Sequence, residues 1–501
     1  MADTIEGLTG QALADLTKGR RSLERYFKEN KQDDLLVAQK HFRSLVSRSP
    51  EYPDGYLMLS YALAENRQEQ EAIGVYDQAL QLLGNPDKSE LQKRRKVYEA
   101  KFFKASSLLR MYRWEDVVEA ARQFQSLATD LDNQTNGQPP TQPEALELHR
   151  KNRYLLARAQ AETAHCYGHA LVLLPKDRSI RPYYEVGLRF LLDDATIDAL
   201  PTPDAIGNRR SLADALLAKS EQFQALSSGV TPIHEKEWKG DRAARLAEVH
   251  GYALYRHAEW LAIANDADFK RDCHIAIRDL ETALLRRPRS YALLQNLGMI
   301  HLNRRFDTKG SDLDIAERYY TRSIEQKPGD YYGPQQLARI YLRKAILANE
   351  STARDAALAR GVTQIKASLD LAPNSRTGIM LSFYLRLAKI GSAKQPPVDD
   401  LTAFVDDANR FDPNASDRVL LWMRLGIGAY HLVGATTQAN FTAKKTDLLE
   451  KADQFVGAIQ DDGIWRNTQM RNATQQLRDR VNILTFDERQ SLQFDLIAAL
   501  D

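Results

Sequence analysis

The stretch AIRDLETALLRRP, residues 276–288, has the apolar spacing of one amphipathic helix that runs into a proline. Ala276 is followed by Leu280 four positions on, by Ala283 three positions later and by Pro288 five positions after that. Side chains at i, i+4 and i+7 share one face of an α-helix, and proline ends a helix because it lacks a backbone N–H. The stretch therefore predicts one buried helix face and a fixed helix end.

The same four, three, five spacing recurs along the chain. Further copies are AQKHFRSLVSRSP (38–50), AIGVYDQALQLLG (72–84, with a final glycine), AERYYTRSIEQKP (316–328), GVTQIKASLDLAP (361–373) and LTAFVDDANRFDP (401–413). A second pattern, with three, one, three spacing, lies next to these copies at YLMLSYAL (56–63), LQNLGMIH (294–301), PQQLARIY (334–341) and WMRLGIGA (422–429). Two alternating helical patterns predict a series of helix pairs.

These paired patterns resemble the tetratricopeptide repeat, in which a bulky residue, Leu, Gly and Tyr mark the first helix and Ala, an aromatic and Pro mark the second. The resemblance covers roughly residues 35–129 and 242–460. Small residues such as Gly298 and Ala276 let two antiparallel helices approach closely. The resemblance implies an all-α, right-handed superhelical solenoid of antiparallel helix pairs.

The repeat period departs from that family. Successive prolines at positions 288, 328, 373 and 413 are 40, 45 and 40 residues apart, whereas the family unit has about 34 residues. HEAT or armadillo units have this longer period and are the alternative. The spacing of the small residues and prolines favours the tetratricopeptide type, with the additional residues in segments inside the repeats.

The turn-rich interruptions and the helical patterns divide the chain. We expect tetratricopeptide-like helix pairs at 1–129, a polar loop at 130–143, and a helical middle segment at 144–240 formed by degenerate repeats or an insertion. Further repeats follow at 241–413, and a last repeat with capping helices occupies 414–501.

Composition and motifs restrict the function. The 501 residues carry 69 basic and 67 acidic side chains, a net charge of +2 that provides no strong overall field to attract nucleic acid. The chain contains no Gly-rich phosphate loop with a lysine, no HExxH and no Gly-x-Ser-x-Gly motif. His165, Cys166 and His169 lie together, but ligands on one helix need a fourth from elsewhere. We therefore expect no enzyme activity, cofactor or metal.

Cysteine use and apolar windows indicate the compartment. Only two cysteines are present, Cys166 and Cys273, and they have no metal or redox spacing, which fits a reducing cytoplasm. The N-terminus lacks the features of a secretory signal. The most apolar long window, LLARAQAETAHCYGHALVLL (155–174), carries Arg158, Glu162, His165 and His169. We expect a cytoplasmic protein that does not span a membrane.

The resemblance also implies where a partner binds, since first helices of this family line a groove that holds peptides or helices of other proteins. Carried over to matching positions, the groove side chains are Tyr61, Glu65, Gln295, Asn296, Met299, Asn303, Gln336, Arg339, Arg343, Arg424 and His431. The first functional hypothesis is therefore a non-catalytic scaffold or regulatory subunit that binds a partner protein or peptide.

Two alternatives remain open from the residues. Basic clusters could neutralise phosphates of a nucleic acid, and the candidate phosphate-binding residues are Lys93, Arg94, Arg95, Lys96, Arg150, Lys151 and Arg153. The C-terminal stretch LTFDERQSLQFDLIAALD (484–501) resembles small helical adaptor modules of bacterial conflict systems. That resemblance implies an adaptor or sensor subunit of a defence or signalling system whose catalysis lies in another chain.

Overall fold

The structure is a computed structural model that describes residues 8, 10–29, 31–87, 90–174, 183, 187–192, 208–230, 236–263, 268–302, 311–373 and 375–392. Throughout these residues the regular structure is helical, which confirms the all-α class. The helices are α1 (Gly10–Glu29), α2 (Gln32–Arg48), α3 (Pro53–Glu65), α4 (Glu69–Leu83), α5 (Leu91–Arg110), α6 (Trp114–Thr135), α7 (Pro143–Leu173), α9 (Arg189–Leu191), α11 (Asn208–Gly229), α12 (Lys236–Ile263), α13 (Asp268–Arg286), α14 (Tyr291–Leu302), α15 (Ser311–Gln326), α16 (Tyr332–Leu347), α17 (Ser351–Leu371) and α18 (Arg376–Ser392).

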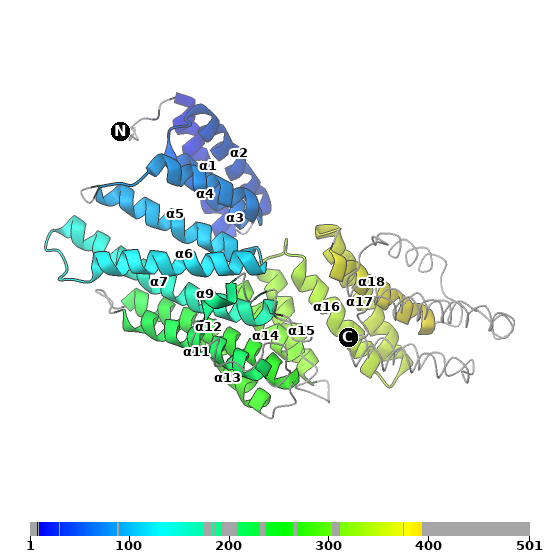
Figure 1. The fold of residues 1–501 in the computed structure, drawn as a ribbon. Coiled ribbons are helices and arrows are strands. Elements are labelled where there is room, and N and C mark those ends of the chain that lie inside the picture. Colours follow the sequence, from blue (N-terminus) through cyan, green and yellow to red (C-terminus); the bar gives the residue numbers. More distant parts are fainter. Residues whose placement is uncertain are drawn as a thin grey trace. The chain divides into compact units, whose positions relative to one another are not determined.

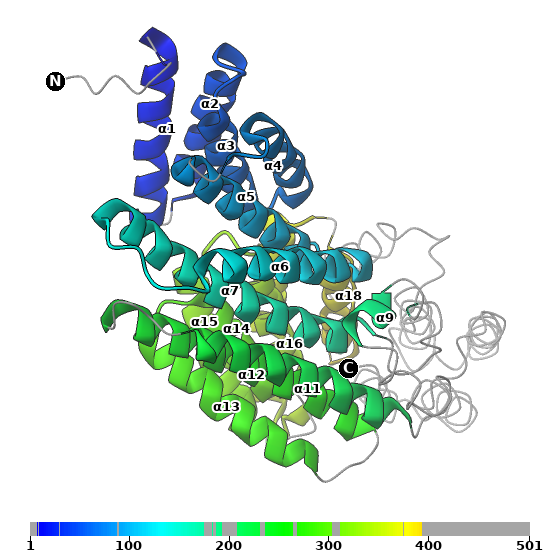
Figure 2. The ribbon, with the colours of Figure 1, turned by 60° about the vertical axis from the view of Figure 1, so that its left-hand side comes forward.

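Residue contacts divide the chain into a first unit, Met1–Asn296, and a second unit, Leu297–Asp501. In the first unit each helix from α1 to α7 packs on the next, and α7 then packs on both α11 and α12 (Figures 1 and 2). The helix α13 pairs with α12. In the second unit α15 packs on α16, and α16 and α17 pack together and on α18. The described helices thus form stacks of helix pairs.

The repeated spacing forms the core of these stacks. The second helices of four pairs are α2, α4, α13 and α15. In each of them the three residues with four, three spacing are at most 1% exposed: Ala38, Phe42, Leu45, Ala72, Tyr76, Ala79, Ala276, Leu280, Ala283, Ala316, Tyr320 and Ser323. In α17, Gly361, Ile365 and Ser368 are buried in the same way. Fully burying one Leu or Phe side chain contributes about 1.5–3 kcal/mol, so the pattern is a large part of the stability of each pair.

The small residues of the first helices accept the large residues of the second. In the second unit, a Cβ on Gly298 of α14 would come within 2.7 Å of the Tyr320 ring of α15. In the first unit, a Cβ on Gly19 of α1 would come within 2.5 Å of the Phe42 ring of α2. Glycine at these positions is therefore required by the close approach of two helices.

The expected helix ends are also confirmed. The helices α2, α13, α15 and α17 end within two residues of the prolines at 50, 288, 328 and 373. After α4, Gly84 has a φ of +60°, a left-handed conformation that glycine adopts without a Cβ clash. The copy at 401–413, the segment 422–429 and the C-terminal capping helices lie outside the described residues.

The middle of the chain continues the stack. The predicted middle segment spans residues 144–240, and α7 forms its first part, up to Leu173. The helix α7 packs against α6, which precedes it, and against α11 and α12, which follow it. The helix α6 extends to Thr135, so the non-helical connection to α7 is residues 136–142. None of the helices that the structure describes is both long and apolar enough to cross a membrane.

Candidate functional site

A pocket of about 400 Å³ opens within the first unit. One face of α7 forms a wall, and α12 lies opposite. The end of α11 and the segment after α13 complete the pocket, and its charged side chains come from α7, α12 and the segment after α13. Its lining residues are Tyr154, Ala157, Arg158, Ala161, Glu162, Ser227, Arg242, Arg245, Glu248, Arg287, Ser290 and Ala292.

A buried ion cluster forms the floor of this pocket. Arg245 of α12 donates from Nε to Glu162 Oε1 of α7 at 3.0 Å and lies 2.7 Å from Glu248 Oε2. Arg287 Nη2 donates to the same Glu248 oxygen at 2.8 Å. Burial alone would raise the pKa of Glu162 and of Glu248, but Arg245 holds the pKa of both carboxyls below the usual range. Both carboxylates are thus ionised and bonded to guanidinium groups.

A chain of polar side chains leads from this cluster into the core between α7 and α12. The second Nη of Arg245 lies 2.9 Å from His165 Nδ1, and the His165 and His169 rings are 4.5 Å apart. The Tyr252 hydroxyl lies 3.5 Å from His169 Nδ1 and 2.6 Å from the Tyr112 hydroxyl. Burial is the main reason that the pKa of His169 lies well below its usual value, and the neighbouring His165 lowers it further. The two histidines therefore belong to a packed polar network.

Arg158 joins the pocket to a row of aromatic rings. Its Cζ lies 4.6 Å from the centroid of the Phe102 ring. The rings of Phe102 and Phe103 on α5, Tyr61 on α3 and Phe27 on α1 follow, with successive centroids 5.6, 5.5 and 5.9 Å apart. We call these four rings the aromatic strip. Its rings lie on three helices of the first unit, α1, α3 and α5, and Arg158 joins them to α7. Phe102, the ring next to Arg158, is buried.

The outer end of the aromatic strip is open to solvent. Phe27 is 54% exposed, although it packs on the Tyr26 and Tyr61 rings. Burial raises the pKa of Tyr61 to about 12, with a smaller contribution from the Glu65 carboxylate. Glu65 in turn lies 3.9 Å from Arg110. Tyr61, one of the residues that the resemblance places in a groove, thus packs on one exposed aromatic side chain, and Glu65, another of them, lies on the same helix as Tyr61.

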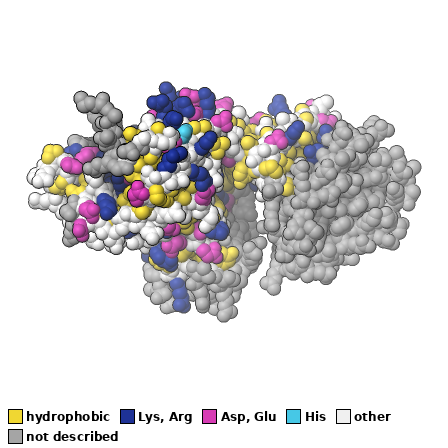
Figure 3. Space-filling model, turned by 90° about the horizontal axis from the view of Figure 1, so that it is seen from above, with side chains coloured by type: hydrophobic (Ala, Val, Ile, Leu, Met, Phe, Trp, Pro, Cys, Tyr) yellow, Lys and Arg dark blue, Asp and Glu magenta, His cyan; other side chains and the backbone are white. Residues whose placement is uncertain are grey.

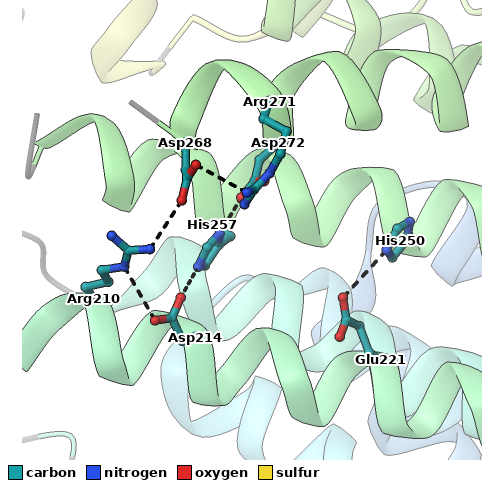
Figure 4. Close-up of polar contacts among 8 residues, drawn as sticks. All are labelled: Arg210, Asp214, Glu221, His250, His257, Asp268, Arg271 and Asp272. Carbon is teal, nitrogen blue, oxygen red and sulfur yellow. Dashed lines mark hydrogen bonds and ion pairs between the residues drawn. The ribbon is translucent and has the colours of Figure 1, made fainter. Parts of the chain in front are cut away.

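A separate cluster holds α11, α12 and α13 together (Figure 4). His257 of α12 lies between two carboxylates, with Nε2 2.7 Å from Asp214 of α11 and Nδ1 2.8 Å from Asp272 of α13. Burial alone would lower the pKa of His257, but hydrogen bonds to Asp272 and Asp214 raise it. We call this arrangement the His257 clamp.

Two arginines complete the charge balance of the His257 clamp. Arg271 lies 3.1 Å from Asp272 and 3.2 Å from Asp268, and Arg210 lies 3.4 Å from Asp268 and 3.7 Å from Asp214 (Figure 4). Each carboxylate therefore meets at least one cation, so that repulsion among the three acidic groups is offset.

The predicted groove residues on α14 and α16 are spread over different environments. Gln295 and Asn296 are half-buried in the first unit. In the second unit, Met299 and Arg339 are half-buried, and the Tyr332 hydroxyl lies 3.9 Å from Met299 Sδ. Their role as a partner surface stays a prediction.

Two further groove candidates are buried in the second unit. Gln336 is 7% exposed and Arg343 is 6% exposed. Arg343 donates to the backbone carbonyl of Leu302 and so holds the end of α14. Their burial leaves little surface for a partner. Asn303, Arg424 and His431 lie outside the described residues.

The candidate phosphate-binding residues on α5 contact acidic or polar neighbours. Lys93 lies 3.4 Å from Glu90, Arg95 lies 2.8 Å from Glu99, and Lys96 lies 2.8 Å from Asp54. Arg94 donates to the Tyr98 hydroxyl at 3.2 Å.

Those on α7 do the same. Arg150 and Lys151 lie 3.8 and 3.6 Å from Glu147, and Arg153 donates to the Thr135 carbonyl. Figure 3 likewise shows acidic side chains among the basic ones on the face that it displays. Phosphate binding by these clusters stays a prediction, since each group has a partner within the chain.

The sequence did not mark Arg242 and Arg245 as site residues, and it showed Arg158 only as a charge in an apolar window. The available signal was the spacing of charges on one helix face, with Arg158 and Glu162 four residues apart and Arg242, Arg245 and Glu248 three apart. That spacing cannot show that the two faces meet across 83 residues of sequence.

No family model matches the chain, and no curated protein is similar to it in sequence. Among solved structures, yeast Tom70 is similar at 14% identity over 97% of this chain and 95% of that chain, with a TM-score of 0.30. The human IFIT1 dimer with m7Gppp-AAAA is similar at 10% identity over 90% and 89%, with a TM-score of 0.34.

A third similar structure is Naa15/Naa10 bound to HypK-THB, at 12% identity over 96% of this chain and 80% of that chain, with a TM-score of 0.28. Identities and scores this low carry no inference about what the present chain binds. Its function is therefore argued from its own residues.

Proposed function

We propose that the chain is a non-catalytic, tetratricopeptide-like scaffold or regulatory subunit that holds a segment of a partner protein on its first unit. The segment lies along the aromatic strip and ends at the arginine-lined pocket. One observation carries this proposal: Arg158 lines the pocket and packs on the buried Phe102 ring, from which Phe103 and Tyr61 lead to the exposed Phe27.

The aromatic strip has the composition of an interaction surface. Aromatic side chains and arginine are enriched where proteins bind one another, because they bury a large area and lose little conformational freedom. Phe27 exposes 54% of its surface at the end of the aromatic strip. Covering it with a partner's apolar side chain removes that area from water.

The pocket itself supports binding rather than catalysis. A general acid or base works best when its pKa lies near the operating pH. Arg245 instead holds the pKa of Glu162 and Glu248 below the range of an ordinary glutamate, despite their burial. Neither carboxylate exchanges a proton readily near neutral pH, so both serve to position the arginines.

Affinity capture with a matched pair of variants tests the scaffold role. Phe27→Asp places a charge on the aromatic strip, and Leu285→Asp places the same charge on α13, where Leu285 is 84% exposed. We expect Phe27→Asp to reduce the recovery of specific partners at least severalfold, measured by quantitative mass spectrometry of material captured from the native lysate. Leu285→Asp should recover them as the unmodified chain does.

Circular dichroism melting of both variants checks that they fold, since both positions are exposed. Equal partner recovery by the unmodified chain and by folded Phe27→Asp would remove the aromatic strip from the binding surface.

A further inference from the structure

We propose that the pocket between α7, α11 and α12 binds a phosphate monoester carried by a side chain of the partner segment. This inference rests on the proposed scaffold function and names the chemical group that its pocket recognises. It concerns Arg158 and Arg287, which are not among the seven candidate phosphate-binding residues named from the sequence.

Arg158 provides the first donor. Among the described residues its guanidinium has no hydrogen bond or ion pair, and its contacts are the faces of the Phe102 and Tyr154 rings at 4.6 and 5.8 Å. Stacking on a ring holds the planar fork in one orientation and leaves its N–H groups available. An arginine fixed in this way is pre-organised to bind an anion with two parallel hydrogen bonds.

Arg287 provides the second donor, from a different element. Its Nη2 is bonded to Glu248, but its Nε is buried and has no hydrogen-bond acceptor within the part of the chain that the structure describes. A buried donor without an acceptor costs about 1–3 kcal/mol. Because Arg287 lines the pocket, an anionic ligand there would give its guanidinium a second acceptor.

The acidic residues of the pocket do not exclude an anion. Glu162 accepts two bonds from Arg245, and Glu248 accepts bonds from Arg245 and Arg287, so that both negative charges are compensated. The lining contains four arginines and two glutamates, which leaves arginine in excess. Arg242, one of these four, donates to the Ser227 and Val230 carbonyls at the end of α11.

The geometry favours phosphate over carboxylate. A carboxylate has two oxygens in one plane and matches one guanidinium fork, whereas a phosphate monoester has three terminal oxygens in tetrahedral directions. Donors from two separate elements, Arg158 of α7 and Arg287 after α13, suit the tetrahedral group. A phosphate monoester also brings a charge of about −1.5 to −2 at neutral pH.

The aromatic strip favours a polypeptide as the carrier of that phosphate. Two neighbouring pairs of rings in the aromatic strip meet edge to face, at 86° and 73°, and the Phe27–Tyr61 pair is tilted at 45°. Single-stranded nucleic acids are held by bases stacked on open aromatic faces along a positive groove. Here Glu65 lies beside Tyr61. A peptide side chain packs on such ring edges without needing a free face.

Fluorescence anisotropy of the full chain with labelled peptide pools tests this inference. One pool is degenerate around a central phosphoserine, and the other is identical but carries serine. We expect the phosphoserine pool to bind at least tenfold more tightly. Arg158→Ala should weaken its binding by roughly tenfold, and Arg158→Lys should be intermediate because it keeps the charge but loses the fork.

Arg278→Ala is the matched control, since the Arg278 side chain is 72% exposed on α13 and lies outside the pocket. Its binding should stay within about twofold of the unmodified chain, because exposed charges contribute little. Thermal melting of each variant shows that it is folded before its affinity is compared.

The remaining outcomes separate the hypotheses. Equal binding of both pools, no binding of either, or unchanged binding by Arg158→Ala would overturn the phosphate site, while the capture result with Phe27→Asp decides the scaffold role independently. Adenosine monophosphate that binds as tightly as the phosphoserine pool would make the ligand a small phosphate instead. Single-stranded RNA that binds more tightly, and requires Arg158, would make it a nucleic acid.

Discussion

His257 lies between two carboxylates, and this arrangement decides its protonation state. Each ring nitrogen is within 2.8 Å of a carboxylate oxygen, so both must carry a proton in order to donate. A neutral imidazole would point one lone pair at a carboxylate. His257 is therefore a cation that ties α12 to Asp214 of α11 and to Asp272 of α13, whereas burial keeps the nearby His169 neutral.

The first prediction concerns the pH dependence of the His257 clamp. The folded-state pKa of His257 is raised above the unfolded value of about 6.5, so its stabilisation is fully present below that pH and is lost as the pH rises through the folded pKa. We expect His257→Gln to lower the free energy of unfolding most at about pH 6 and progressively less toward about pH 9, measured by urea denaturation.

His274→Gln provides the control on α13, because His274 is exposed. Its free energy of unfolding should follow that of the unmodified chain at every pH. A constant difference between His257→Gln and the unmodified chain across the same range would show that His257 acts only by packing.

At the scale of helices, the repeat spacing predicted which helix faces are buried and where the helices end. It located the buried faces of α2, α4, α13, α15 and α17 and the prolines that end four of them. These features depend on residues within one helix and its turn. The segment 144–240 lacked the spacing, yet α7 and α11 continue the stack because apolar and small residues such as Gly168 still pack there.

The pocket was not predictable in the same way, because it forms where charged positions of α7 and α12 meet. Arg158 and Glu162 were visible only as polar residues in an otherwise apolar window. Whether a charge in such a window is solvated, paired or functional depends on the helix that covers it. Arg245 meets its carboxylate partners on α7 and α12 only in the folded chain, so the pairing cannot be read from either helix alone.

The second prediction tests how α7 and α12 are joined. Arg245→Met leaves the buried Glu162 and Glu248 without their shared cation, and breaking a buried pair in this way costs about 3–5 kcal/mol. We expect a loss of that size in the free energy of unfolding at pH 7. The loss should become smaller as the pH falls, because the two carboxyls can then be neutralised by protonation.

Arg25→Met is the comparison for a surface pair, since Arg25 lies 2.7 Å from Asp34 with its side chain 49% exposed. Such pairs contribute at most about 1 kcal/mol. Losses of similar size in the two variants, or a loss in Arg245→Met that does not change with pH, would contradict the structural role assigned to Arg245.

For the whole molecule, the consequence of stacked helix pairs is that most contacts join neighbours in the sequence. In the described helices α1 to α7, each packs mainly on the one before and the one after, and α16 to α18 form their own set of contacts. In such stacks stability is approximately a sum over pairs and their interfaces. A local defect should therefore loosen its neighbours and leave distant helices protected.

The last prediction uses Gly361 of α17 to create such a defect. A Cβ there would come within 2.5 Å of Leu385 of α18 and 3.4 Å of Tyr341 of α16, so Gly361→Val overpacks a contact that joins three helices. Overpacking of this kind costs about 1–3 kcal/mol. Hydrogen–deuterium exchange followed by mass spectrometry should show faster amide exchange in α16, α17 and α18, and unchanged exchange in α5, α6 and α7. Gly74→Val on α4, where a Cβ meets nothing within 4 Å, should leave both regions unchanged. Faster exchange in α5 to α7 of Gly361→Val would instead mean that the chain unfolds as one cooperative body, because nearest-neighbour coupling alone cannot carry a defect so far.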